Sequence, residues 1–159
     1  MRKVLIIGCG NPLRSDDGVA WQILEQLERR PGFESVTMIR CHQLTPELAE
    51  PISAAHRVIF VDARVGETPV RVSVYRIRSS KAEREPFSHH VDPPALLDCA
   101  DALFGKRPEA FVASVGIGFL GYGEQLSEVV RNSLDFLRER VVELASGGEV
   151  PEARAPVTR

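Results

Sequence analysis

The strongest constraint on the fold is the regular alternation of short apolar runs with amphipathic helical stretches. Residues 3–8, which are apolar from Val4 to Ile7, and residues 58–61 are runs of strand length rich in β-branched side chains, the pattern of strands covered on both faces in a parallel sheet. Between them, residues 17–30 carry apolar side chains at the 3.6-residue period of a helix with one buried face. Residues 35–41 read as another strand, and a short helix is expected from Thr45. This order predicts strand–helix–strand units.

The second half of the chain continues the alternation. Residues 70–75 alternate Val with polar residues, which predicts a half-exposed strand at an edge of the sheet. Asp92, followed by two prolines, marks the start of a helix, and residues 111–115 predict a fifth strand. The last helix has an apolar residue every three or four positions across residues 126–144. We therefore predict an α/β fold, a three-layer α/β/α sandwich around a mostly parallel, five-stranded twisted sheet.

Size and charge restrict the class of protein further. At 159 residues the chain has the usual size of one domain. We expect residues 1–145 to form a single α/β domain and residues 146–159 to be a disordered tail. The balance of 20 Lys and Arg against 22 Asp and Glu gives a net charge of −2, which argues against nucleic-acid binding. No apolar run has the length of a membrane span, and three scattered cysteines make no disulfide framework, so a cytoplasmic protein is expected.

Polar side chains suited to chemistry follow the predicted strands at their carboxyl ends, where parallel sheets bind ligands. Asn11 and the pair Asp16-Asp17 follow the first strand, and Asp62 ends the third. The pair His89-His90 lies shortly before a predicted helix start. Two carboxylates and one imidazole make a plausible set for a borderline divalent ion such as nickel or zinc, with open positions left for another partner.

Each of these residues also has a purely structural interpretation. A single Asp at a helix start most often caps the helix, and we assign that role to Asp16, which leaves Asp17 to point elsewhere. Gly10 and Asn11 would shape the loop. Asp62 can cap a turn, yet a carboxylate beside a second one is repelled unless a cation or proton lies between them. A loop histidine is more often a surface or packing residue than a ligand.

The glycines after the first strand invite a dinucleotide-binding interpretation, which the sequence excludes. The fingerprint needs a third glycine where this chain has Leu13, and the second strand does not end in an acid. A pyrophosphate would also have to approach a helix start that already carries Asp16 and Asp17, whose negative charges repel it.

Three segments of this chain match a known family. The segment Gly8-Cys9-Gly10-Asn11-Pro12-Leu13-Arg14-Ser15-Asp16-Asp17-Gly18-Val19 resembles the N-terminal signature of the hydrogenase maturation proteases. The strand Val58-Ile59-Phe60-Val61-Asp62-Ala63 and the segment Ser88-His89-His90 are similar to two further features of that family. The resemblance spans roughly residues 3–144. These endopeptidases remove the C-terminal extension from the large subunit of [NiFe] hydrogenases.

The resemblance implies which residues act and which metal they meet. The family's metal-contacting residues, which are also the expected catalytic ones, fall on Asp17, Asp62 and His90, with His89 the weaker candidate of the two histidines. It implies that nickel arrives in the hydrogenase precursor and serves as a recognition handle, so that no permanently bound cofactor is expected. Two accounts of cleavage stay open. Either a carboxylate is the general base for a water molecule, or the metal of the substrate polarises the carbonyl or activates that water.

Two segments depart from the family pattern. Residues 41–47 stand where a Gly-Gly-Thr-like segment is common, and residues 117–127 stand where an Ile-x-Pro-Glu-like segment is common. Both follow strands on the expected substrate side, which suggests a divergent subgroup with its own hydrogenase partner. Two other functions remain as alternatives. One is a non-catalytic nickel chaperone or adaptor for the precursor, and the other is a metal-assisted small-molecule hydrolase.

Cys9, Cys41 and His42 offer a possible second, softer metal site, because the two cysteines end neighbouring strands. Free cysteines are usually small buried apolar residues, and we favour that interpretation. Trp21 is expected to be a core or partner-contact residue rather than a catalytic one.

Overall fold

The computed structural model describes residues 2–65, 71–77, 91–117 and 121–150. Strands and helices alternate along these residues in the predicted order. The elements are β1 (Val4–Cys9), the 3₁₀ helix η1 (Ser15–Gly18), α1 (Val19–Glu28), β2 (Thr37–Cys41), the 3₁₀ helix η2 (Pro46–Leu48), α2 (Ala49–Ala54), β3 (Arg57–Val65), β4 (Val72–Arg76), α3 (Pro93–Phe104), β5 (Glu109–Ile117) and α4 (Glu128–Ala145).

In the described part of the chain, the sheet has five strands in the order β2-β1-β3-β5-β4. β1 pairs in parallel with β2 and β3, and β3 pairs in parallel with β5. β4 is antiparallel to β5 and lies at the edge, where its alternating pattern placed it. The predicted fold class, a mostly parallel α/β sheet, is confirmed.

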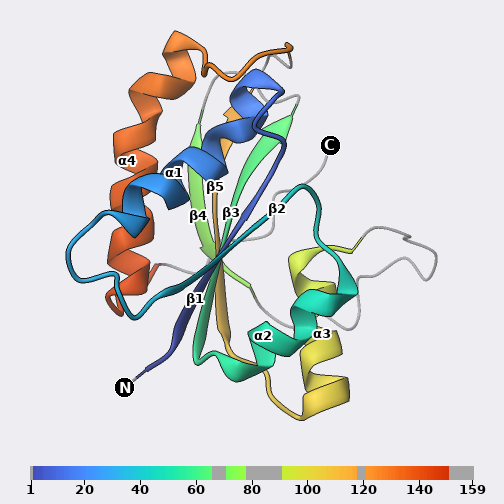
Figure 1. Ribbon diagram of the computed structural model, residues 1–159. Coiled ribbons are helices and arrows are strands. Elements are labelled where there is room, and N and C mark those ends of the chain that lie inside the picture. The colour runs from blue at the N-terminus through green and yellow to red at the C-terminus, as the bar shows by residue number, and fades with distance from the viewer. Residues whose placement is uncertain (1, 66–70, 78–90, 118–120, 151–159) are drawn as a thin grey trace.

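Two helix layers cover the sheet, as Figure 1 shows: α1 and α4 lie on one side, and α2 and α3 on the other. Along the central strands, alternate side chains pack against one helix layer and then the other. Ile6 and Ile59 are buried against α1 and α4, whereas Leu5 and Phe60 are buried against α2 and α3. This two-sided burial explains why the central strands are continuously apolar. Within the described helices, none has both the length and the hydropathy needed to cross a membrane.

Local signals in the sequence account for the ends of the later helices. The Asp92 carboxylate accepts a hydrogen bond from the Ala95 amide at 2.8 Å, with Pro93 as the first helical residue of α3. Gly105 ends that helix with a φ of 67°, a conformation that glycine adopts without steric cost. Ser127 is the N-cap of α4.

A buried arginine ties the amino-terminal end of the sheet to the end of α4. The Arg57 side chain is 4% exposed and forms an ion pair with Glu109 at 3.0 Å. Its guanidinium also donates to the carbonyls of Leu144 at 2.8 Å and Gly148 at 2.7 Å, and it lies over the ring of Phe111. Residues 146–150, which the sequence analysis assigned to the tail, therefore include a hydrogen-bond partner of the core, and residues 151–159 lie outside the described residues.

Replacing Arg57 with Met should lower the free energy of unfolding by about 2–4 kcal/mol, because two carbonyls and one carboxylate lose a charged donor. Urea denaturation followed by circular dichroism measures this. Arg131→Met, on the surface of α4, is the matched control. An Arg57→Met protein as stable as the wild type would show that the contacts of Arg57 contribute little.

Candidate functional site

The loop between β1 and η1 is built so that Asp17 turns back towards the sheet. Gly10 has a φ of +148°, and a Cβ atom there would lie 2.0 Å from the Asp17 carbonyl oxygen, so only glycine fits. The Asn11 amide donates to Asp17 Oδ2 at 2.8 Å, and Asn11 Oδ1 accepts from the Leu13 amide at 3.0 Å. Gly18 packs against Pro12, where a Cβ would lie 2.8 Å from the proline Cα. The predicted loop-shaping roles of Gly10 and Asn11 are thus confirmed.

The prediction that Asp16 caps the following helix is wrong. α1 begins after Gly18 without a side-chain cap, because the 3₁₀ turn η1 stands in front of it. Asp16 is 2% exposed, and its carboxylate instead accepts the Ser127 amide at 2.6 Å and the Ser127 hydroxyl at 2.8 Å. Asp16 therefore joins the loop of Asp17 to the N-terminus of α4, an end of a helix that attracts negative charge.

Two backbone hydrogen bonds strengthen that junction. The Ser15 amide donates to the Gly123 carbonyl, and the Gly123 amide donates to the Leu13 carbonyl, both at 2.8 Å. Ser15 has a φ of 51°, which is uncommon for a residue with a side chain. The segment before α4 thus stabilises the turn that carries Asp17.

Asp62 lies on β3 beside the end of β1. Because Gly8 pairs with Val61, the next residues, Cys9 and Asp62, follow at the same edge. Burial, together with the weaker effect of the Asp17 charge, raises the pKa of the Asp62 carboxyl to about 6. A hydrogen bond from the Ala63 amide at 2.7 Å and the charge of Arg64 act in the opposite direction. The structure thus brings two of the predicted site residues, Asp17 and Asp62, within electrostatic reach of each other.

His90 and its alternative His89 lie outside the described residues. Among the residues that are described, no group of three or more His, Cys, Asp and Glu side chains is placed to hold a metal ion. The predicted ligand set of Asp17, Asp62 and a histidine therefore stays a prediction, with only its two carboxylates in the described part of the chain.

A small cavity of about 110 Å³ opens beside Asp62, on the face of the sheet that α2 and α3 cover. Ser114 pairs in register with Asp62 across β3 and β5, so their side chains leave the sheet on the same face. Ser114 is fully buried, and its hydroxyl has no hydrogen-bond partner in the described structure. The Tyr75 ring and Leu44 also line this cavity. Sequence reasoning missed Ser114, because a serine in an apolar strand carries no signal until its neighbour across the sheet is known.

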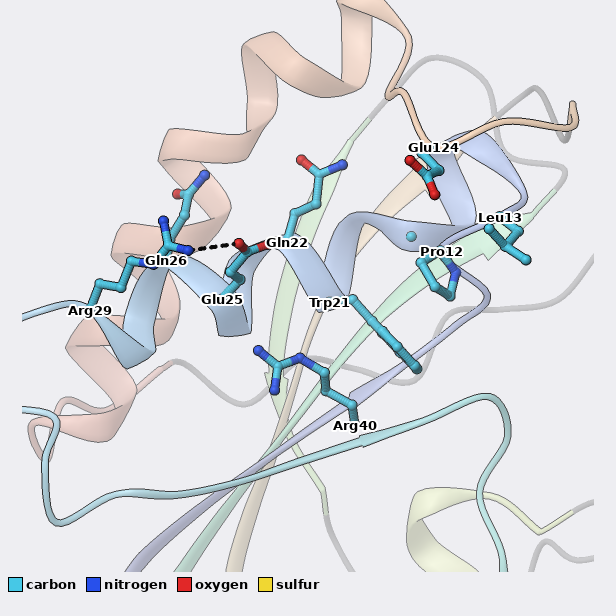
Figure 2. A pocket seen from close by; sticks show the side chains of 10 residues that line it. Pro12, Leu13, Trp21, Gln22, Glu25, Gln26, Arg29, Arg40 and Glu124 are labelled. Carbon is cyan, nitrogen blue, oxygen red and sulfur yellow. Dashed lines mark hydrogen bonds and ion pairs between the residues drawn. The ribbon is translucent and has the colours of Figure 1, made fainter.

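A larger groove of about 500 Å³ begins at the same loop and runs along α1. Figure 2 shows Trp21 on α1 and Arg40 on β2 lining it together, with Leu13 and Glu124 towards the loop end. The Trp21 indole nitrogen donates to the Cys41 carbonyl at 3.2 Å, which fixes the ring at the junction of helix and strand. Trp21 is therefore a half-buried groove residue, consistent with a core or partner-contact role.

Each of the two segments that depart from the family pattern contributes a residue to the lining of the small cavity or of the groove. Leu44, from residues 41–47, lines the small cavity, and Glu124, from residues 117–127, lines the groove. Tyr122 in the second segment is 97% exposed, and Leu13 beside it is 58% exposed. The divergent residues thus line the two hollows nearest the carboxylate pair.

Solved structures of the same architecture identify the fold. The hydrogenase maturating endopeptidase HybD from E. coli is 24% identical, with a TM-score of 0.67 over 91% of this chain and 94% of that one. The [NiFe] hydrogenase maturation protease HycI from Thermococcus kodakarensis is 19% identical, with a TM-score of 0.69 over 92% and 94%. The hydrogenase 2 maturation peptidase from Thaumarchaeota archaeon SCGC_AB-539-E09 is 22% identical, with a TM-score of 0.67 over 91% and 99%.

The chain is thus a three-layer α/β/α protein with paired carboxylates at the carboxyl edge of its sheet. Its fold is that of the hydrogenase maturation proteases, as the sequence resemblance implied. Comparisons of the sequence with protein-family models and with curated proteins give no match.

Replacing Asp16 with Ala should lower the free energy of unfolding by about 2–3 kcal/mol, because the Ser127 amide and hydroxyl lose a buried charged acceptor. Asp16→Asn should cost less, since its carbonyl oxygen still accepts the amide. Urea denaturation measures both, with Asp101→Ala on the exposed face of α3 as the control. Equal stability of Asp16→Ala and the wild type would contradict the assigned role.

The raised pKa of Asp62 also predicts a pH dependence of stability. The folded chain holds the Asp62 proton more tightly than the unfolded chain, whose carboxyl has the ordinary pKa of 3.8. The stabilisation by this proton is complete below about pH 4 and is lost as the pH rises through about 6. Asp62→Asn should therefore be more stable than the wild type at pH 7, by about 1–2 kcal/mol. Denaturation curves at pH 4 and pH 7 measure the difference, and an unchanged pH dependence in the variant would refute it.

Proposed function

We propose that this protein is a cytoplasmic endopeptidase that removes the C-terminal extension of a [NiFe] hydrogenase large-subunit precursor after nickel insertion. The observation that carries the proposal is the pairing of Asp17 and Asp62 at the carboxyl edge of a maturation-protease fold. Two carboxylates that repel each other gain most from a cation between them, and a precursor loaded with nickel delivers one.

Nickel belongs to the substrate in this proposal. Asp17, Asp62 and His90 contact the ion when the precursor docks, with His89 as the weaker alternative to His90. Since the protein's own part of the ligand set is small, affinity for free nickel is low and recognition depends on the ligands that the precursor contributes. The protein therefore needs no permanently bound cofactor, and it distinguishes a filled metal centre from an empty one.

The surroundings of Asp62 suit the role of general base. A carboxyl with a pKa of about 6 is mostly ionised at neutral pH, yet it is a stronger base than an ordinary aspartate. The unpartnered Ser114 hydroxyl on the neighbouring strand offers a second hydrogen bond to a water molecule in the same cavity. In the alternative account, nickel in the precursor polarises the scissile carbonyl and Asp62 serves as its contact.

The groove along α1 provides room for the substrate chain. It starts at Pro12 and Leu13, on the loop that positions Asp17, and extends past Trp21 to Arg29. An extended segment of the precursor lying in this groove reaches the carboxylate pair with one end. The exposed Leu13 and Tyr122 give that segment an apolar contact at the entrance.

The test of the proposal is cleavage of a purified precursor. Mixed with nickel-loaded precursor, the protein should release a short C-terminal peptide, seen as a loss of mass, whereas nickel-free precursor should stay intact. Asp17→Asn, Asp62→Asn and His90→Ala should slow cleavage by about 100-fold or more.

Matched controls separate function from folding. Asp101→Asn, on the exposed face of α3, should cleave at the wild-type rate, and His89→Ala should retain far more activity than His90→Ala. Tight binding of the precursor without cleavage would favour the adaptor or chaperone function. Absence of both binding and cleavage would favour a small-molecule hydrolase.

A further inference from the structure

We propose that Cys9 and Cys41 form a reversible dithiol–disulfide site beside the carboxylate pair, which low-molecular-weight disulfides such as glutathione disulfide oxidise. This inference goes beyond the peptidase activity and does not depend on it. It rests on the placement of two cysteines that the proposed mechanism leaves unused.

The strand register sets the two cysteines opposite each other. Cys9 is the last residue of β1, Cys41 is the last residue of β2, and the two are direct partners in the parallel ladder. Partners on neighbouring strands point to the same face, with strand axes about 4.8 Å apart. That spacing lies within the Cα separation of about 4.4–6.8 Å that disulfides span.

The backbone around Cys41 keeps the pair together. The Cys41 carbonyl accepts the Gly10 amide at 3.0 Å and the Trp21 indole nitrogen at 3.2 Å, which fixes the end of β2 against β1. The two thiols lie within hydrogen-bond reach of each other. Their contacts to carbonyls are long and weak, from Cys9 to the His42 carbonyl at 3.6 Å and from Cys41 to the Gly8 carbonyl at 3.8 Å. Forming a disulfide therefore removes only weak hydrogen bonds from the two thiols.

Reagents reach both sulfurs, since neither cysteine is fully buried and Cys9 lines the cavity that also holds Asp62. One cysteine thiolate attacks a sulfur of glutathione disulfide, forms a mixed disulfide and releases one glutathione thiolate. The thiolate of the second cysteine then attacks the protein sulfur of the mixed disulfide and releases the second glutathione. Two protein thiols lose two electrons and two protons, and one disulfide becomes two thiols.

Partial exposure makes such a bond open to reduction, because both cysteines are only half-buried. Exposed disulfides are among the labile ones, which glutathione reduces. Cys99 is half-buried on helix α3, outside the strand ladder that pairs Cys9 with Cys41, and provides an internal control.

The full-length reduced protein, equilibrated with mixtures of reduced and oxidised glutathione and then alkylated, tests the inference by mass spectrometry. The wild type and Cys99→Ala should lose two hydrogen atoms per chain, with a Cys9–Cys41 peptide in the non-reduced digest. Returning the mixture to excess reduced glutathione should reverse the change. Cys9→Ala and Cys41→Ala should form no internal bond.

The peptide map of the wild type decides the question even if a cysteine variant fails to fold. Mixed disulfides with glutathione alone, at every ratio, would overturn the proposal, and so would an internal bond that includes Cys99. Because the readout is mass and needs no precursor, failure here is distinct from failure of the cleavage experiment.

Discussion

The parallel register between β1 and β3 decides which side chains meet at the carboxyl edge of the sheet. Gly8 pairs with Val61, so Asp62 emerges directly beside the loop that leads from β1 to Asp17. Without that pairing the two carboxylates have no common neighbourhood. The rise in the pKa of Asp62 through the charge of Asp17 follows from it. The cavity, the half-buried Cys9 and the start of the groove all lie at this same edge.

Holding two carboxylates at one partly buried edge is unfavourable for the fold, because burial and repulsion both penalise the second charge. Contacts elsewhere offset this cost. Asp16 accepts two hydrogen bonds from Ser127 and so links the loop of Asp17 to the N-terminus of α4. Arg57, at the amino-terminal end of β3, donates a hydrogen bond to the Leu144 carbonyl near the other end of α4. The last helix thus supports the site at one end and the sheet at the other. Destabilised functional groups held by a stable frame are typical of sites that bind or transform a ligand.

The segments that differ from the common family pattern concentrate around the same edge. Residues 41–47 contribute to the cavity, and residues 121–127 contribute to the groove and to the junction with Asp16. The paired cysteines belong to these surroundings, at the ends of β1 and β2.

The sequence by itself determined the elements of the fold and singled out the two carboxylates as candidates. Continuous apolar strands, helical periodicity and the caps at Asp92 and Gly105 are local signals, and local physics is sufficient to predict them. Asp62 stood out because a charged residue directly follows a buried apolar run, and Asp17 because it belongs to an acidic pair at the start of a helix. Only the tertiary structure decided the partner of Asp16, because Ser127 is 111 residues away in the sequence. Capping the next helix and bonding to Ser127 would both satisfy the Asp16 carboxylate, so the local sequence does not distinguish them. The same holds for Ser114 and for the facing cysteines, because strand register depends on the packing of the whole sheet, which no short stretch of sequence encodes.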